Sequence, residues 1–159
     1  MEVKFTTIGT IHTPFTTLDD MPIQPSAGRD IRGEVMLDEA FQAGLKDLED
    51  FSHIYLIYYW HMANRTDLEV TPYLDTKKHG VFATRSPLRP VKIGLSVVRL
   101  LSVNGNRLEI SDVDMLDGTP LLDIKPFVPV FDNHLDAKPG WLKANPDEIA
   151  HKRSDKRFI

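Results

Sequence analysis

The sequence predicts a mainly β protein: a single β-barrel-like domain with one clear helix and a short C-terminal extension. Residues 51–62 form a long apolar and aromatic run without a helical stripe. The dipeptide Asn104-Gly105, typical of tight hairpins, separates two further apolar runs. Strand-like runs do not alternate regularly with helical ones, and no Gly-x-Gly-x-x-Gly follows a strand. These features favour a barrel or a strongly curved sheet over a dinucleotide-binding α/β fold.

The first strand is expected over residues 5–13, with Gly9 marking a bulge or a close backbone approach. Residues 14–32 contain three prolines and form a long connection. Loops of this length in a compact domain often bind something. Gln24, near the middle, offers donors and acceptors to a ligand, with a loop merely packed on the surface as the alternative.

A short strand over residues 33–37 is followed by Asp38, which is suited to cap a helix that ends near Glu49. Residues 51–62 are then predicted to form a long strand covered on both faces, central in a sheet or in a barrel wall. Two histidines eight residues apart in this strand make no metal motif, so no metal is expected. At the strand end, His61 is a candidate contact for a heteroaromatic ligand, with a buried structural histidine as the alternative.

Residues 64–80 are polar and are interpreted as an exposed excursion, and residues 81–84 as a strand. Residues 93–103 and 107–115 flank the Asn-Gly turn and should pair antiparallel. The last strand-like run, residues 121–130, carries two prolines.

Because proline cannot donate to a sheet ladder, that run is expected at a sheet edge or leaving the sheet. The chain beyond it is polar with mixed charge. We therefore divide the sequence into a barrel domain, residues 1–133, and a tail or short helix, residues 134–159.

Charge is strongly segregated along the chain, although the net charge is only −4. Residues 1–76 hold 13 acidic and 5 basic side chains, whereas residues 77–108 hold seven basic and no acidic ones. Such a basic band can attract phosphate on an acidic protein, with a solvated basic face as the alternative. Within the band, Arg85 and Arg89 are each followed closely by proline, which predicts rigid presentation of both cations.

The sequence gives no support to several other classes of protein. Cysteine is absent, which excludes disulfides and thiolate catalysis and is compatible with the cytoplasm, where we expect the protein to be. No apolar run reaches the length of a signal peptide or a membrane span, so no membrane association is expected. A Walker sequence and a Gly-x-Ser-x-Gly elbow are also missing.

Several sequence blocks, in this order, resemble the TsaA-like family, whose characterised members are the TrmO tRNA methyltransferases. The blocks are Ile8-Gly9-Thr10-Ile11, Thr13-Pro14-Phe15, Gln24-Pro25, Leu48-Glu49-x-Phe51-Ser52-His53, residues 80–96, Asp114-x-x-Asp117-Gly118-Thr119-Pro120 and Asp123-Ile124-Lys125-Pro126. The resemblance implies a homodimeric, S-adenosylmethionine-dependent enzyme that methylates N6 of N6-threonylcarbamoyladenosine beside the tRNA anticodon. It also implies a β-barrel in place of the usual methyltransferase fold.

The resemblance carries site residues over by motif. The implied cofactor contacts are Ile23, Gln24, Pro25, Trp60, His61, Arg85, Leu95, Asp112, Val113, Asp114, Met115 and Leu116. The candidates for a catalytic base are His61, Asp114 and Asp117, among which the sequence does not choose. The candidates for tRNA contact are Arg89, Lys92 and Lys125. The family usually has arginine where Ile23 stands, and Arg-Pro-Asn-Pro-Ile-Gly where residues 89–94 here include Val91 and Lys92.

Two other functions remain compatible with the residues. A non-catalytic β-barrel module that binds RNA or a nucleotide would explain the basic band and the altered loop at residues 89–94. A purely structural dimer module would leave every ligand affinity unchanged when Arg85 is replaced. Methyl transfer to tRNA separates the first function from both alternatives.

Overall fold

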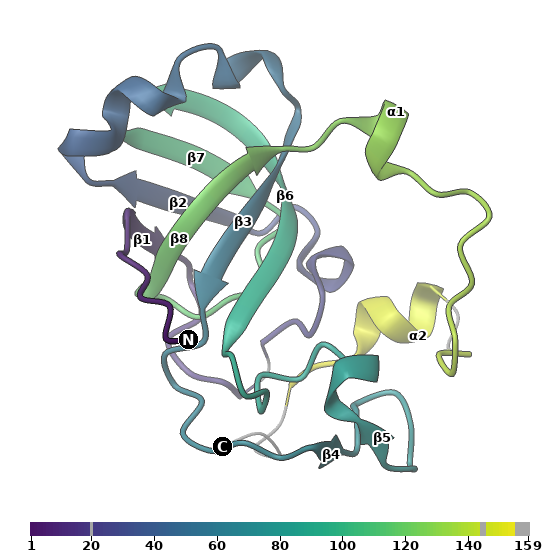
Figure 1. Ribbon diagram of the computed structural model, residues 1–159. Helices are drawn as coiled ribbons and strands as arrows, with labels where there is room; N and C mark the ends of the chain where they lie inside the picture. Colours follow the sequence, from purple (N-terminus) through teal and green to yellow (C-terminus); the bar gives the residue numbers. More distant parts are fainter. Residues whose placement is uncertain (20, 144–145, 155–159) are drawn as a thin grey trace.

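The computed structural model describes residues 1–19, 21–143 and 146–154. Six antiparallel strands close into a barrel in the order β1-β2-β7-β6-β3-β8 (Figure 1). These strands are β1 (Gly9–His12), β2 (Arg32–Leu37), β3 (His53–Tyr59), β6 (Ile93–Asn104), β7 (Arg107–Ser111) and β8 (Thr119–Pro126). The mainly β barrel predicted from the sequence is therefore confirmed.

The barrel core consists of the inward-facing residues of every strand. In β3, for example, Ile54 and Leu56 are fully buried, whereas Tyr55 and Ile57 on the outer face are only half-buried. The other members of the buried core are Ile11, Val35, Leu37, Leu45, Tyr58, Val98, Leu100, Leu108, Ile110, Val113, Met115 and Leu121. β3 lies in the barrel wall, one of the two expected positions, and pairs with both β6 and β8.

The hairpin predicted at Asn104-Gly105 joins β6 to β7, with Asn104 paired to Arg107. Gly105 has a φ of 63°, the left-handed conformation that such a turn requires. At Gly9 the backbones approach closely, because a Cβ there would stand 2.3 Å from the carbonyl oxygen of Met36. The close approach inferred from the sequence is thus present, although β1 begins only at Gly9 and not at residue 5.

The predicted helix is present as two 3-10 segments, η2 (Glu39–Leu45) and η3 (Leu48–Asp50), which lie together at one end of the barrel (Figure 1). Asp38 makes no side-chain capping bond. Asp47 interrupts the segment with a φ of 65°, so the chain turns before η3. The segment buries Leu45 against the barrel.

One expectation for the later strands was wrong, and another was right in one of its two alternatives. Residues 81–84 are not a strand, because residues Val81–Ala83 form the 3-10 helix η4, closed by bonds from Thr84 N and Oγ1 to the Val81 carbonyl. The run at residues 121–130 is not at an edge, because β8 pairs with both β1 and β3 and a closed barrel has no edge. Pro126 ends β8, and after a bond from Phe127 N to the His53 carbonyl the chain leaves the sheet, which was the other alternative (Figure 1).

Residues between β3 and β6 form a small lobe with its own core. Strands β4 (Glu69–Val70) and β5 (His79–Gly80) pair, and Val70, Val81 and Leu88 pack against Tyr73. The excursion expected over residues 64–80 is therefore partly ordered by burial. The lobe lies at the barrel end opposite η2 (Figure 1).

The remaining elements are η1 (Pro25–Gly28) in the long first loop, α1 (Pro129–Asp132) and α2 (Pro146–His151). The segment that carries α1 leaves the barrel, and α2 returns beside the small lobe (Figure 1). There Arg153 forms a β-bridge with Pro22, which ties the C-terminal segment to the first loop.

Candidate active site

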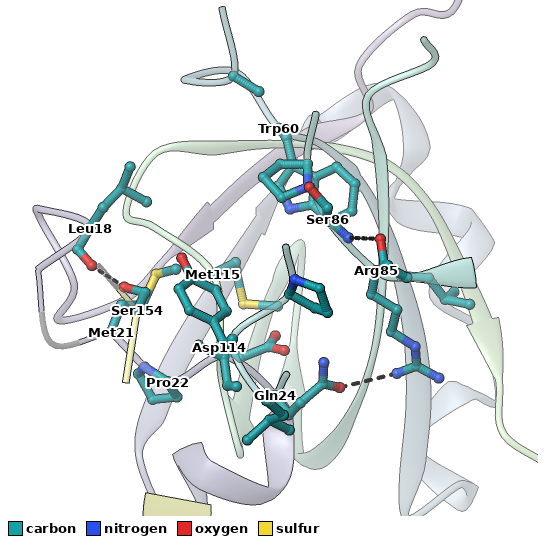
Figure 2. A pocket seen from close by; sticks show the side chains of 18 of the residues that line it. Leu18, Met21, Pro22, Gln24, Trp60, Arg85, Ser86, Asp114, Met115 and Ser154 are labelled. Carbon is teal, nitrogen blue, oxygen red and sulfur yellow. Dashed lines mark hydrogen bonds between the residues drawn. The ribbon is translucent and has the colours of Figure 1, made fainter. Parts of the chain in front are cut away.

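A cavity of about 710 Å³ opens at the barrel end that carries the small lobe. Three parts of the chain form its walls (Figure 2). The barrel end and the loop after β7 contribute Tyr58, Trp60, His61, Leu95, Asp114, Met115, Leu116 and Thr119. The small lobe contributes Pro72, Tyr73, Leu74, Phe82, Ala83, Thr84, Arg85, Ser86 and Pro87. The first loop and the C-terminal segment contribute Leu18, Met21, Ile23, Gln24, Trp141, Leu142, Ile149 and Ser154.

The loop after β7 is held rigidly before it reaches the cavity. Asp112 has a φ of 69°, and its Oδ1 accepts a hydrogen bond of 2.8 Å from the backbone N–H of Asp30. Val113 is fully buried, and a Cβ on Gly28 would stand only 2.2 Å from its carbonyl oxygen. Only glycine permits η1 to lie this close to the loop. These contacts set the position of the next residue, Asp114.

Asp114 is the carboxyl group that lines the cavity. Burial raises the pKa of its carboxyl to about 6, against the opposing effects of a hydrogen bond from Ser96, the positive charge of Arg85 and its own backbone N–H. Ser96 Oγ donates to Asp114 Oδ1 over 2.7 Å. A carboxyl that titrates near neutrality inside a cavity is a candidate for proton transfer.

Tyr58 lies behind Ser96, with its hydroxyl 3.0 Å from Ser96 Oγ. Both side chains are buried, and the ring of Trp60 meets the ring of Tyr58 edge-on at 6.1 Å. Burial, followed by the charge of Asp114, raises the pKa of Tyr58. Tyr58 is therefore a neutral hydrogen-bonding group across the physiological pH range.

Arg85 is carried by the loop that follows η4. Its Nη1 donates to Gln24 Oε1 over 3.2 Å, which links the small lobe to the first loop across the cavity (Figure 2). Arg89 holds the loop from behind, because its Nη1 donates to the carbonyl of Thr84 over 2.8 Å. Ser86 N also bonds Thr84 Oγ1. The rigid loop expected from the proline pattern is thus fixed mainly by hydrogen bonds.

The C-terminal segment closes one side of the cavity. Trp141 Nε1 donates to the Ala83 carbonyl over 2.7 Å, and its ring stacks on His79 at 4.4 Å. Ser154 N donates to the Met21 carbonyl over 2.8 Å, and Ser154 Oγ bonds the carbonyl of Leu18 (Figure 2). Residues far along the chain therefore supply one wall.

A protein-family model described as the tRNA-methyltransferase O N-terminal domain matches residues 10–133. The chain belongs to this family. The TrmO resemblance stated from the sequence blocks is therefore confirmed.

Similar proteins include a probable S-adenosyl-L-methionine-binding protein of Pyrococcus abyssi, 55% identical over 96% of this chain and 83% of that protein. The tRNA (adenine(37)-N6)-methyltransferase of Mus musculus is 35% identical over 79% of this chain and 31% of that protein. A crystal structure of TrmO matches with a TM-score of 0.77 and 41% identity, covering 88% of this chain and 64% of that one. This chain thus spans less than two thirds of that solved TrmO chain.

The cavity of this TrmO-family chain brings together most of the cofactor contacts implied by the motifs. Those that line it are Ile23, Gln24, Trp60, His61, Arg85, Leu95, Asp114, Met115 and Leu116. Asp112 and Val113 do not line it and instead hold the loop, as described above. Pro25 begins η1, and its side chain lies outside the described part of the structure.

Asp117 does not line the cavity, unlike the other two candidate bases. Its Oδ1 accepts hydrogen bonds from Thr13 N at 3.1 Å and bonds His12 Nδ1 at 3.0 Å. Burial alone would raise the pKa of Asp117, but these bonds and those from its other neighbours lower it overall. Asp117 thus anchors the turn before β8 to the chain after β1.

The three candidate tRNA contacts occupy different places. Arg89 is half-buried and donates to backbone carbonyls of its own loop. The backbone carbonyl of Lys92 accepts from Trp60 N at the cavity end of the barrel. Lys125 pairs with Asp123 at 2.8 Å and lies opposite Tyr55, near the far end of β8. The cavity end of β8 is its first residue, Thr119.

Sequence reasoning missed Tyr58, Ser96 and the wall formed by Trp141. Alternation along β3 placed Tyr58 on the same face as Trp60, which is a signal that both point inward. Nothing in the sequence pairs Ser96 with Asp114. The contact arises only because β6 and the loop after β7 meet at one barrel end.

Within the described residues, no group of three or more His, Asp or Glu side chains is placed to hold a metal ion. The same part of the chain contains no helix of the length and apolarity needed to cross a membrane.

Proposed function

We propose that this chain is an S-adenosylmethionine-dependent methyltransferase that acts on tRNA. The observation that carries the proposal is the cavity at the end of the TrmO-family barrel, where Asp114 and Arg85 face the same space. Relatives named for S-adenosyl-L-methionine binding and for tRNA methylation support both halves of the proposal. The proposal therefore keeps the cofactor and the tRNA substrate that the family resemblance implied.

The lining residues fit the chemistry of this cofactor. Arg85 would bind its carboxylate. Trp60 offers an aromatic face for adenine or the sulfonium. The volume of about 710 Å³ falls within the usual range of about 300–1,000 Å³ for ligand pockets. We retain Ile23, Gln24, Leu95, Met115 and Leu116 as proposed contacts.

We propose that the target is N6 of N6-threonylcarbamoyladenosine beside the tRNA anticodon, as the family resemblance implies. The bound sulfonium supplies an electrophilic methyl group. The target nitrogen belongs to a urea-like group and is a weak nucleophile, so positioning and proton removal matter most. His61 and Asp114 line the cavity and are the proposed proton acceptors, whereas Asp117 would act by holding the turn before β8.

We propose residues 1–133 as the catalytic domain. The segment from residue 134 onward would form one wall of the cavity. This division is supported by the end of the family match at residue 133 and by the contacts of Trp141. For the anionic tRNA, Lys92 is our first proposed contact because it lies at the cavity end, with Arg89 and Lys125 as the others.

A homodimer in the cytoplasm is also proposed. Apolar side chains are exposed beside the cavity, among them Met62 at 57%, Phe82 at 73% and Leu95 at 51%, and a second copy would cover such a surface. Light scattering combined with size exclusion tests the dimer, and a monomeric mass would contradict it.

The decisive experiment incubates the protein with S-adenosylmethionine and tRNA from cells that lack this methylation, followed by mass spectrometry of the nucleosides. A cofactor-dependent gain of one methyl group on the threonylcarbamoyl nucleoside is expected. Methylation of a different nucleoside would contradict the proposed substrate. Binding of RNA without methyl transfer would favour the non-catalytic module.

Calorimetry tests the cofactor site separately. Loss of a charge-assisted hydrogen bond costs about 1.5–3 kcal/mol, so Arg85→Ala should weaken cofactor binding about tenfold or more. The matched control is Arg99→Ala, which removes an exposed arginine opposite His53, away from the cavity. Equal affinities of the two variants would contradict the proposed role of Arg85.

A further inference from the structure

Three side chains from three parts of the barrel form a continuous hydrogen-bonded chain that ends in the cavity. Tyr58 comes from β3, Ser96 from β6 and Asp114 from the loop after β7. The two contacts measure 3.0 Å and 2.7 Å. Neither Tyr58 nor Ser96 is exposed by more than 3%. Figure 2 shows the Asp114 carboxyl pointing into the cavity, toward the side that holds Gln24.

The number of hydroxyl hydrogens sets the direction in which these hydrogen bonds run. A serine hydroxyl has one hydrogen, and an ionised carboxylate only accepts. When Asp114 is ionised, Ser96 must donate to it and therefore accepts from Tyr58. When Asp114 is protonated on Oδ2, Oδ1 still accepts from Ser96 and the direction of the hydrogen bonds is unchanged. The bonds from Tyr58 to Ser96 and from Ser96 to Oδ1 can therefore persist before and after Oδ2 takes up a proton.

The tyrosine at the start of this series of hydrogen bonds is also held in place by close packing. A Cβ on Gly94 would stand 2.2 Å from Cε2 of Tyr58, so the tyrosine ring lies directly against the glycine backbone. Trp60 packs edge-on against the same ring. Because Tyr58 pairs with Gly94 across β3 and β6, the ladder itself fixes the hydroxyl behind Ser96.

We propose that Ser96 and Tyr58 are positioning residues that fix Oδ1 of Asp114, leaving Oδ2 to accept the proton of the substrate N–H during methyl transfer. This rests on the proposed methyltransferase function. The nitrogen–carbon bond forms as the carbon–sulfur bond breaks, its electron pair passing to sulfur. The N–H proton goes to Oδ2, and that electron pair remains on nitrogen.

The other ionisable groups of the cavity wall are Arg85 from the small lobe, His61 after β3 and Tyr73. The charge of Arg85 and the Ser96 bond both lower the pKa of Asp114 against the effect of burial. Removing the Ser96 hydroxyl should therefore raise that pKa further, by about one unit for a bond of about 1.5 kcal/mol.

The test compares Ser96→Ala, Ser96→Thr and Tyr58→Phe with the wild-type chain. Side-chain ¹³C shifts give the pKa of Asp114, and the pH profile of kcat gives its effect on turnover. If the pKa moves from about 6 to about 7 in Ser96→Ala, the ionised fraction at pH 6 falls about fivefold, and kcat should follow. Ser96→Thr should restore both values. Tyr58→Phe, which keeps the ring, should shift them in the same direction by less.

Two neighbours on the same strands are matched controls. Ser102→Ala removes a hydroxyl that donates to Glu109 over 3.2 Å, and Tyr55→Phe alters the outer face of β3. Both should leave the pKa of Asp114 and the kcat profile unchanged. If the profile shift is due to positioning as well as titration, Ser96→Ala should stay at least several-fold slower at pH 8.5, where the carboxyl is ionised.

Wild-type values of both observables in Ser96→Ala and Tyr58→Phe would overturn the proposal, as would full recovery of kcat at pH 8.5. The carboxyl titration does not depend on turnover. Absence of methyl transfer by the wild-type chain would therefore reject the proposed function, whereas an unchanged Asp114 pKa in the variants would reject the positioning chain.

Discussion

Replacement of Asp114 by asparagine should stabilise the protein at neutral pH while abolishing methyl transfer. Burial raises the pKa of Asp114 from 3.8 to about 6, so the folded protein binds this proton more tightly than the unfolded chain. Its contribution to stability is present below pH 4 and is lost as pH rises through 6. Asparagine resembles the protonated acid, so the variant avoids the unfavourable free energy of a buried, ionised carboxylate.

The size of the effect follows from the shift. About two pKa units at about 1.4 kcal/mol each give a gain of at most about 3 kcal/mol at pH 7. For a chain of this length, that corresponds to a rise in Tm of about 6–12 °C. The gain should be near zero at pH 4 and complete by pH 7.

Urea unfolding of the ligand-free protein at five pH values between 4 and 8, followed by tryptophan fluorescence, measures this difference. Asp117→Asn is the matched control with the opposite sign, because the pKa of Asp117 is lowered and its ionised form is favoured in the folded protein. That variant should be destabilised at pH 7. An Asp114→Asn variant no more stable than wild type at pH 7, or one with the same gain at pH 4, would refute the reasoning.

Three further substitutions test the framework of the cavity. Arg89→Ala removes the bond to the Thr84 carbonyl and should lower the free energy of unfolding by about 1–3 kcal/mol in urea; unchanged stability would show that the bond does not hold the loop. Gly94→Ala drives a methyl group into Tyr58 and should lower Tm by several degrees, so a wild-type Tm would contradict the close packing. Trp141→Phe removes the indole N–H that bonds the backbone of η4 and should weaken cofactor binding about threefold by calorimetry; equal affinity would mean that the C-terminal wall is dispensable.

Local patterns predicted those parts of the fold whose causes are local. The β6–β7 hairpin follows from Asn104-Gly105, and the central strand β3 follows from its unbroken apolar run. The pattern misled at residues 81–84, where an apolar run that suits a strand closes as a 3-10 turn around the Val81 carbonyl. At Pro126 the pattern left two alternatives open, and the structure shows that the chain leaves the sheet there while β8 itself is paired on both sides.

The sequence by itself determined the fold class and the family, because these depend on periodicity and on the order of short motifs. Most of the cofactor contacts that the motifs implied also line the cavity, although most of the cavity wall was not predicted. Only the tertiary structure decided which of them act together. It separated Asp117 and Lys125 from the cavity and joined Asp114 to Ser96 and Tyr58, which lie 18 and 56 positions earlier. The physical reason is barrel closure, which brings the ends of β3 and β6 and the loop after β7 to one rim whatever their separation along the chain.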